Sequence, residues 1–241
     1  MKIFGLFNFY TMKYYIVDDS LEENVVGKDY PQAYNFIKGY NPRAPEALFS
    51  LYKLGNRFPD YTPNIDGLML SGYAKLTDFV STVFSPDMFV LSDRVKTLFE
   101  AYNLCPHRFY PVGLYKRKVK QNYHMLHVLS YCYLDYIDFE RSSFILKSRS
   151  PAEKSSCPIS LKSKADFMEQ DSKLVQKAGV MWQTIRATKI VMTPDFDKEL
   201  DFFFVFWVDT NLYISERLKN AIESNGMTGW IFTPATNLIV E

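Results

Sequence analysis

The sequence predicts an α+β protein in which mostly antiparallel strands are joined by a few helices, and three observations support this fold class. Phe, Tyr and Trp make up 17% of the 241 residues, and aromatic side chains favour strands and large buried surfaces. Hydrophobic residues make up 47% and charged residues 23%, which is typical of a globular protein and excludes a disordered chain or a coiled coil. A strand–helix–strand pattern also occurs twice. We therefore expect a single α+β domain over residues 1–241.

The first third of the chain predicts short elements. Residues 2–7 and 13–18 are apolar or aromatic runs, which indicate two strands of an opening hairpin. Prolines and glycines interrupt residues 30–72 so often that only short elements fit there. One of these is a helix near residues 45–54, where apolar side chains recur at helical spacing. We expect a second helix over residues 75–84.

The remainder alternates strand patterns with one loop and one helix. Residues 108–146 are rich in Tyr, Phe, Val, Leu and Ile and predict about three strands. Residues 147–164 are rich in Ser and basic residues, which favours an exposed, mobile loop. An arm that binds nucleic acid is the alternative for this loop, but no aromatic residue is interleaved there for base stacking. We expect a helix over residues 165–177 and strands over residues 188–192, 202–208 and 212–214.

An internal repeat relates residues 92–111 to residues 215–234, which are identical at six of twenty positions when aligned at a constant offset. A strand pattern precedes each segment, so the full units span residues 88–111 and 212–234. Within each unit, apolar residues recur at helical spacing and a strand pattern follows. We therefore predict two similar strand–helix–strand units.

The ends of the two repeated helices carry capping signals. Ser92 and Ser215 stand where an N-cap is expected, and an acidic residue follows each of them at the positive end of the helix. Gly226 and Asn103 stand where a left-handed C-terminal cap is expected. The basic residues of both helices lie opposite the apolar faces, so we expect them to be exposed: Arg94, Lys96, Arg217 and Lys219.

Charge and cysteine content exclude several classes of protein. The chain has 28 Lys and Arg against 27 Asp and Glu, and this balance argues against a protein whose main task is binding nucleic acid. Three widely spaced cysteines, Cys105, Cys132 and Cys157, do not form a disulfide framework, and they indicate free thiols in a reducing compartment. Polar residues interrupt the apolar N-terminus, and no run reaches 18 apolar residues, so we expect no signal peptide, no membrane span and a cytoplasmic location.

Motifs for catalysis, metals and cofactors are absent or weak. The sequence has no P-loop, no dinucleotide fingerprint, no HExxH and no CxxC, so we predict neither a cofactor nor a metal site. His124 and His127 are three apart in a strand pattern and should therefore face opposite sides. An enzyme of unrecognised type that uses Asp138 and Glu140 with His124 or His127 remains the alternative, although solvated carboxylates at a hairpin turn or edge are the favoured explanation of the acidic pair.

Two stretches carry a resemblance to a known family. The segment FFFVFWVDTNLYISERLKNAIESNGMTGWIFTP resembles the C-terminal block of a bacterial immunity-protein family from polymorphic-toxin systems, once known only as a domain of unknown function. The stretches HRFYPVGLY and YHMLHVLSYCYLDYIDFERSSF are also similar to that family. The residues that match its C-terminal motif, and that we expect to be mainly structural, are Ser215, Glu216, Arg217, Leu218, Lys219, Gly226, Thr228 and Gly229.

The resemblance implies binding rather than catalysis. Immunity proteins bind a cognate protein toxin, so the chain is expected to be a non-catalytic, stoichiometric inhibitor whose partner is a toxin domain. Such binding needs a complementary surface with aromatic and Arg anchors. The resemblance implies no catalytic residue.

The toxin-binding surface is predicted in the irregular parts of the chain, residues 18–72 and the loop 147–164, because the repeated units are occupied with folding. Acidic side chains there can steer a basic partner and aromatic ones can anchor it. An ordinary solvated loop with its aromatic side chains in the core is the alternative. The candidate toxin-binding residues are Asp18, Asp19, Glu22, Glu23, Tyr30 and Tyr34, with Phe36 and Tyr40 nearby.

Overall fold

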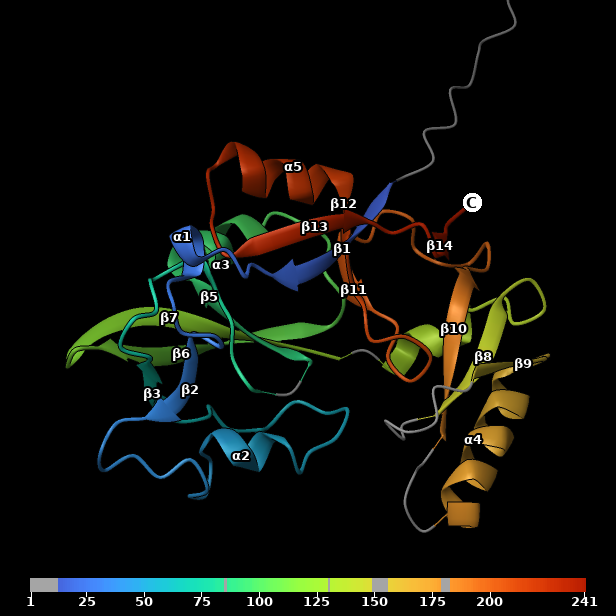
Figure 1. Cartoon of the computed structure of the whole chain (residues 1–241), viewed down its shortest axis with the longest axis horizontal. Helices are drawn as coiled ribbons and strands as arrows, with labels where there is room; N and C mark the ends of the chain where they lie inside the picture. Colours follow the sequence, from blue (N-terminus) through green and yellow to red (C-terminus); the bar gives the residue numbers. More distant parts are fainter. Residues whose placement is uncertain (1–12, 85, 130, 149–155, 179–182) are drawn as a thin grey trace, which may run out of the picture. The chain divides into compact units, whose positions relative to one another are not determined.

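The computed structural model describes residues 13–84, 86–129, 131–148, 156–178 and 183–241 (Figure 1). These residues form two compact units, each of which is described by itself. The larger unit consists of Tyr15–Asp135 and Glu199–Pro234, and the smaller unit contains Tyr136–Lys198 and Ala235–Glu241. Within the described ranges, no helix is long and apolar enough to cross a membrane.

A six-stranded sheet forms one part of the larger unit, with the strand order β2-β3-β6-β7-β5-β4. β6 and β7 are the longest strands and form an antiparallel hairpin, whereas β3 runs parallel to β6. Leu68, Val90, Leu114 and Met125 lie fully buried on this sheet. The strands are β2 Ala33–Phe36, β3 Ile65–Leu70, β4 Phe79–Val80, β5 Met88–Ser92, β6 His107–Lys116 and β7 Val119–Val128.

A four-stranded sheet forms the other part of the larger unit, with the order β11-β12-β1-β13. α5 lies along one face of this sheet, where the ammonium of Lys219 sits over the rings of Tyr15 and Phe232 (Figure 1). The strands are β1 Tyr14–Asp19, β11 Phe202–Phe204, β12 Leu212–Ser215 and β13 Trp230–Pro234. The helices of the larger unit are α1 Glu23–Val26, α2 Leu48–Leu51, α3 Asp93–Phe99 and α5 Glu216–Ser224.

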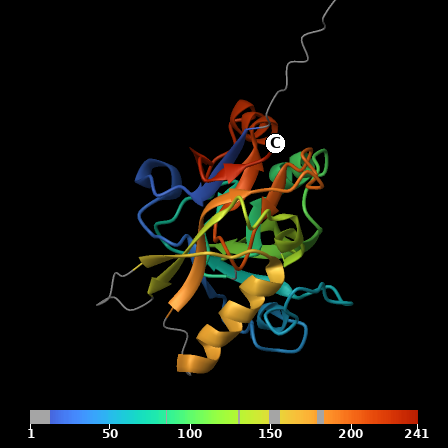
Figure 2. The same ribbon diagram turned by 90° about the vertical axis from the view of Figure 1, so that its right-hand side faces the viewer.

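The smaller unit has its own sheet, with the order β14-β10-β8-β9, and α4 packs beside β10 (Figure 2). Its core includes the rings of Phe139 and Phe144, which stack with centroids 5.5 Å apart, and the buried ring of Phe167 from α4. The elements are the 3-10 helix η1 Tyr131–Tyr136 at its boundary, β8 Ser143–Ser148, β9 Ser156–Ile159, α4 Lys164–Ala178, β10 Gln183–Val191 and β14 Leu238–Ile239.

The α+β class is confirmed, but two predicted elements in the first part of the chain are not. The helix predicted near residues 45–54 is only the single turn α2, and its N-cap is Ala47. The helix predicted over residues 75–84 is wrong, because Phe79 and Val80 pair with β5 as strand β4. The strand predicted over residues 13–18 is β1, and its neighbours are β12 and β13; residues 2–7, its predicted partner, lie outside the described residues.

The second part of the chain follows the prediction more closely. β6, β7 and β8 fill the region predicted as strands, and α4 extends the predicted helix by one residue at each end. The strand predicted over residues 202–208 ends early at Phe204. Residues 156–159 form β9, so the predicted loop 147–164 is shorter than expected, while residues 149–155 lie outside the described residues. The mobility of this segment stays a prediction.

Both repeat units have the predicted strand–helix–strand order, and both lie in the larger unit. The hydroxyl oxygens of Ser92 and Ser215 accept hydrogen bonds from the backbone N–H of Val95 and Leu218, so both N-caps are confirmed. Gly226 has φ 58° and closes α5 with the paired backbone hydrogen bonds of a Schellman turn.

The corresponding expectation for the first copy is wrong, because Asn103 is not among the residues with positive φ. Its backbone N–H instead donates to a carboxylate of Asp201, which fixes an ordinary conformation at this turn. The organisation of the whole chain as one domain stays a prediction.

Candidate functional site

A groove of about 520 Å³ opens on the larger unit beside the four-stranded sheet. Its floor and walls are mostly apolar, and Leu21 and Ile231 at its margin are 65% and 38% exposed. The lining residues are Val17, Asp18, Asp19, Leu21, Tyr30, Phe79, Pro86, Phe89, Phe204, Thr210, Leu212 and Ile231. Exposed apolar side chains around a concavity are typical of a surface that binds another molecule.

Carboxylates mark one wall of this groove. Asp18 and Asp19 end β1, and the hydroxyl of Tyr30 donates a hydrogen bond to Asp19 Oδ2 at 3.1 Å. Burial raises the pKa of Asp19; the Tyr30 hydrogen bond works against this rise, and the neighbouring charge of Asp18 adds to it. Burial and the Asp19 charge also raise the pKa of Tyr30. The groove therefore presents negative charge next to apolar surface.

The groove continues into a smaller cavity of about 150 Å³, which shares Asp19, Phe79 and Phe89 with it. Phe84 and Met88 add further apolar surface there. The two concavities together give an apolar track along β4 and β5 with one carboxylate at the junction.

The structure brings only part of the predicted toxin-binding set into the groove. Asp18, Asp19 and Tyr30 line it, whereas Glu22 and Glu23 are exposed beside α1, and Glu23 lies 3.6 Å from the ammonium of Lys28. Tyr34 is 47% exposed on β2 and does not line the groove.

The two aromatic residues predicted nearby follow the alternative interpretation. The rings of Phe36 and Tyr40 contact each other, with centroids 5.3 Å apart, and Phe36 packs against the hydrophobic core.

Sequence reasoning missed the aromatic lining of the groove. Phe79 and Phe89 come from β4 and β5 of the six-stranded sheet, and Phe204 comes from β11 of the four-stranded sheet. A signal was present: the residues around Phe79, KLTDFV, match KELDFF around Phe202 at the same offset as the repeat. Extending the repeat in this direction would have assigned residues 79–80 to a strand.

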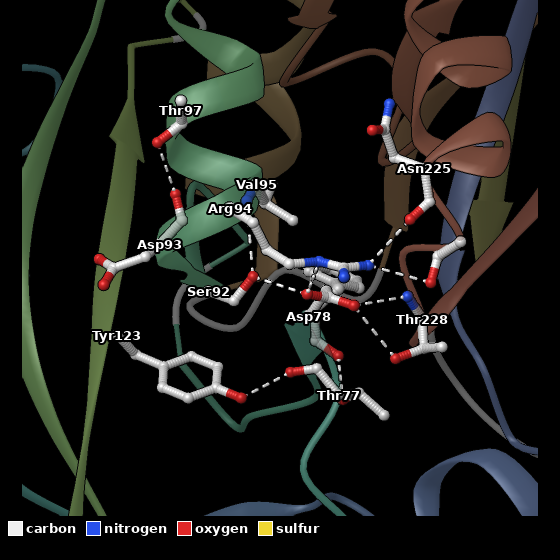
Figure 3. A network of polar contacts seen from close by, with 12 residues as sticks. Thr77, Asp78, Ser92, Asp93, Arg94, Val95, Thr97, Tyr123, Asn225 and Thr228 are labelled. Carbon is white, nitrogen blue, oxygen red and sulfur yellow. Dashed lines mark hydrogen bonds and ion pairs between the residues drawn. The ribbon is translucent and has the colours of Figure 1, made fainter.

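Asp78 connects the two copies of the repeat (Figure 3). Its Oδ1 accepts from the hydroxyl of Ser92 at 2.7 Å and lies 2.8 Å from Nε of Arg94, and its Oδ2 accepts from the backbone N–H of Thr228 at 2.9 Å. Arg94 also donates to the carbonyl oxygens of Asn225 and Gly226. The first copy thereby holds the turn that follows α5.

Asp201 forms the counterpart. It lies 14 residues before Ser215, just as Asp78 lies 14 residues before Ser92. Its Oδ1 accepts from Ser215 and from Nε of Arg217, both at 2.5 Å, and its Oδ2 accepts from the backbone N–H of Asn103 at 2.9 Å. The second copy thereby holds the turn that follows α3.

Several residues of the C-terminal motif make contacts within the fold. Leu218 is fully buried, the carboxylate of Glu216 accepts from the hydroxyl of Tyr15, and Thr228 binds Asp78. Gly229 has φ 100°, and a Cβ there would lie 2.2 Å from the carbonyl oxygen of Phe79.

The basic residues of the two helices are not equally exposed. Arg94 and Arg217 are exposed as predicted. Lys96 and Lys219 are only 27% and 16% exposed at their side chains, because each ammonium pairs with a glutamate one turn on and lies over an aromatic ring. Their predicted exposure is therefore corrected to partial burial.

The residues of the catalytic alternative have separate surroundings. Asp138 and Glu140 belong to the smaller unit, where Asp138 Oδ1 accepts from the backbone N–H of Arg141. His124 lies in the larger unit with Nε2 2.5 Å from Asp93 Oδ1, and it lines a second cavity of about 540 Å³. His127 is 1% exposed among the rings of Phe58 and Tyr110.

Burial lowers the pKa of His127. The different surroundings of the two histidines agree with their predicted placement on opposite faces. Among the described residues, no cluster of His, Cys, Asp and Glu has the arrangement of a metal site. Cys105 is buried and Cys157 is exposed.

Comparison with known proteins supplies the family. A search of curated proteins gave no significant match. The family model described as "Immunity protein family (Imm11)" matches residues 13–237, which is nearly the whole chain. The match includes β1 and β13, the residues that line the groove and both copies of the repeat. The chain therefore belongs to the Imm11 immunity protein family.

Proposed function

We propose that this protein binds a cognate protein toxin in the cytoplasm and neutralises it as a stoichiometric, non-catalytic inhibitor. The family match over residues 13–237 carries this proposal. Immunity proteins act by binding, and an inhibitor of this kind needs an accessible surface with apolar anchors and complementary charge.

The groove beside β1 is the surface that best fits this role. It offers the rings of Phe79, Phe89 and Phe204 as contacts for an inserted apolar side chain. Asp18 and Asp19 supply its charge, and neither Lys nor Arg is among its described lining residues. We therefore propose that a segment of the toxin with an apolar anchor next to a Lys or Arg occupies this groove.

The first test is direct neutralisation. The full chain is mixed with a candidate cognate toxin domain, and toxin activity is measured while the molar ratio is varied. A stoichiometric inhibitor abolishes activity near one equivalent and co-purifies with the toxin domain. Residual activity with excess chain, or substoichiometric inactivation with turnover, would contradict the proposed role.

The second test locates the interface with a matched pair of variants. Asp18→Asn with Asp19→Asn removes two charges from the groove, whereas Glu22→Gln with Glu23→Gln removes two charges just outside it. The groove variant should weaken binding by at least about 2 kcal/mol, since an acid that faces a cation in a desolvated interface contributes on this scale. The outer variant should change mainly the association rate. Equal effects of the two variants would argue against the groove.

A further inference from the structure

The tip of the β6–β7 hairpin carries a cluster of positive charge, of which only Lys120 forms an ion pair among the described residues. Lys116, Arg117, Lys118 and Lys120 lie within five consecutive positions. Arg117, Lys118 and Lys120 are exposed, as is Val119 between them, at 59%. In the described part of the chain, no ion pair or hydrogen bond involves the side chains of Lys116, Arg117 or Lys118.

The turn at this tip has an unfavourable sequence. Lys116 pairs with Val119, so Arg117 and Lys118 are the two residues of the turn, and their φ angles are 48° and 72°. A two-residue hairpin turn with positive φ at both positions favours Asn-Gly, because side chains larger than Asn are strained in the left-handed region. Folding would therefore be served better by other residues, and sites that break a local rule without structural gain are commonly functional.

The acidic residues near the tip do not neutralise it. The carboxylate of Asp66 is bound by the ammonium of Lys120 at 2.7 Å and by the hydroxyl of Tyr115 at 3.0 Å. The Lys120 hydrogen bond, with that of Tyr115, holds the pKa of Asp66 below its usual range, so this acid is ionised and already occupied. Of the remaining three cations, Arg117 and Lys118 are exposed and Lys116 is half-buried.

A concave surface begins two residues from the turn. Lys120 and Gly113 line the cavity of about 540 Å³ that also contains His124 and Tyr123. In this cavity Asp93 pairs with His124, as Asp66 pairs with Lys120. The cavity walls thus carry the carboxylates of Asp66 and Asp93, and the unpaired positive charge is concentrated at the tip.

We propose that the tip, residues 116–120, is a second contact element that binds a carboxylate-rich surface of the toxin domain. This inference rests on the proposed function and adds a contact of opposite charge to the one made by the acidic groove. Complementary charge at a protruding tip accelerates association and orients the partner. Val119 offers an apolar contact among the cations, whereas the turn itself has no aromatic side chain on which a nucleic-acid base would stack.

The experiment exploits the strained turn. Arg117→Asn with Lys118→Gly removes two charges and installs the preferred turn sequence, so this variant should fold with an equal or higher Tm. Lys38→Asn with Lys53→Asn is the matched control, because it removes the same charge from exposed positions elsewhere in the larger unit. Association of each full-length variant with the toxin domain is measured by stopped flow at several salt concentrations.

We expect the association rate of the tip variant at low salt to fall about tenfold and its salt dependence to flatten, while the control changes little. An unchanged rate for the tip variant, with toxin still neutralised, would overturn this inference and leave the proposed function intact. Failure of the unmodified chain to neutralise toxin would overturn the proposed function itself. The tip would be assigned to nucleic acid instead by a different result. In that case the unmodified chain and the control bind a single-stranded oligonucleotide saturably, the tip variant does not, and toxin association is the same for all three.

Discussion

The two copies of the repeat use the same local device in different surroundings. In each copy an Asp lies 14 residues before the capping Ser. This Asp binds both the Ser and the Arg that lies two positions after the Ser. The side chain of Asp78 is 13% exposed, whereas that of Asp201 is 0% exposed. The two arginines are similarly exposed, at 52% and 49%. The copies therefore differ chiefly in how much water reaches the carboxylate.

The two copies of the repeat exchange contacts. Asp78 of the first copy binds Thr228 of the second, and Asp201 of the second binds Asn103 of the first. Phe79 and Phe202 hold matching positions. The backbone N–H of Phe79 donates to the carbonyl oxygen of Thr228 after α5, and the carbonyl oxygen of Phe202 accepts from the backbone N–H of Cys105 after α3. Neither helix turn is thus stabilised by its own copy alone, and the two units support each other reciprocally.

The largest effect is expected from Asp201→Ala. This change leaves Ser215, the N–H of Asn103 and the inner edge of Arg217 without their acceptor at a site closed to water. Each buried donor left without an acceptor costs about 1–3 kcal/mol, so we expect a total loss of about 3–5 kcal/mol. Chemical denaturation at pH 7 measures the loss; a change below about 1 kcal/mol would show that the contacts are replaced by water.

Asp78→Ala should have a smaller effect of the same kind. Water reaches this carboxylate, and Arg94 retains the carbonyl oxygens of Asn225 and Gly226 as acceptors. We expect a loss of about 2 kcal/mol, in the range for hydrogen bonds to a charged group. The same denaturation series provides the comparison, and a loss equal to or greater than that of Asp201→Ala would refute burial as the distinguishing factor.

The C-terminal ends of α3 and α5 also differ between the copies, and this difference predicts the next largest effect on stability. Gly226 has φ 58° and open space where a Cβ would be, so Gly226→Ala should cost only the conformational penalty of about 1 kcal/mol. Gly72→Ala is the control, because Gly72 also has open space around it but lacks a positive φ. Thermal unfolding should show a lower Tm for the first variant and no loss for the second. A matching loss in both would mean that packing, rather than φ, explains the effect.

Sequence patterns predicted these copies because capping and helical spacing act locally. Ser92, Ser215 and Gly226 have the roles that their neighbours in sequence dictate. Asn103 does not, since its conformation is set by Asp201, which lies 98 residues away. The helix predicted over residues 75–84 failed for a similar reason: β4 is held by pairing with β5 and by the turn after α5.

The candidate groove was only partly predictable. Asp18, Asp19 and Tyr30 were found because acidic and aromatic residues in an irregular segment stand out in a sequence. The apolar wall formed by Phe89 and Phe204 was not found, since both residues resemble ordinary strand residues and meet only through the sheets. Sequence patterns therefore identify the polar residues of such a groove more readily than its apolar lining.

The smallest expected effect on stability comes from Tyr123, which lies near Asp78 of the first copy. Its hydroxyl donates to the carbonyl oxygen of Thr77 at 2.8 Å (Figure 3). Burial, and secondarily the Asp78 charge, raise its pKa from the ordinary value of 10.0 to about 12. Because the folded state holds this proton more tightly than the unfolded state, stability is retained below pH 10 and falls as the pH rises from about 10 to 12. At about pH 10.5 the loss should be less than about 1 kcal/mol.

Tyr123→Phe should flatten this part of the stability profile relative to the unmodified chain, and Asp78→Asn should lower the Tyr123 pKa, which is read from tyrosinate absorbance. Identical alkaline profiles for the Phe variant and the unmodified chain would show that Tyr123 does not carry this pH dependence.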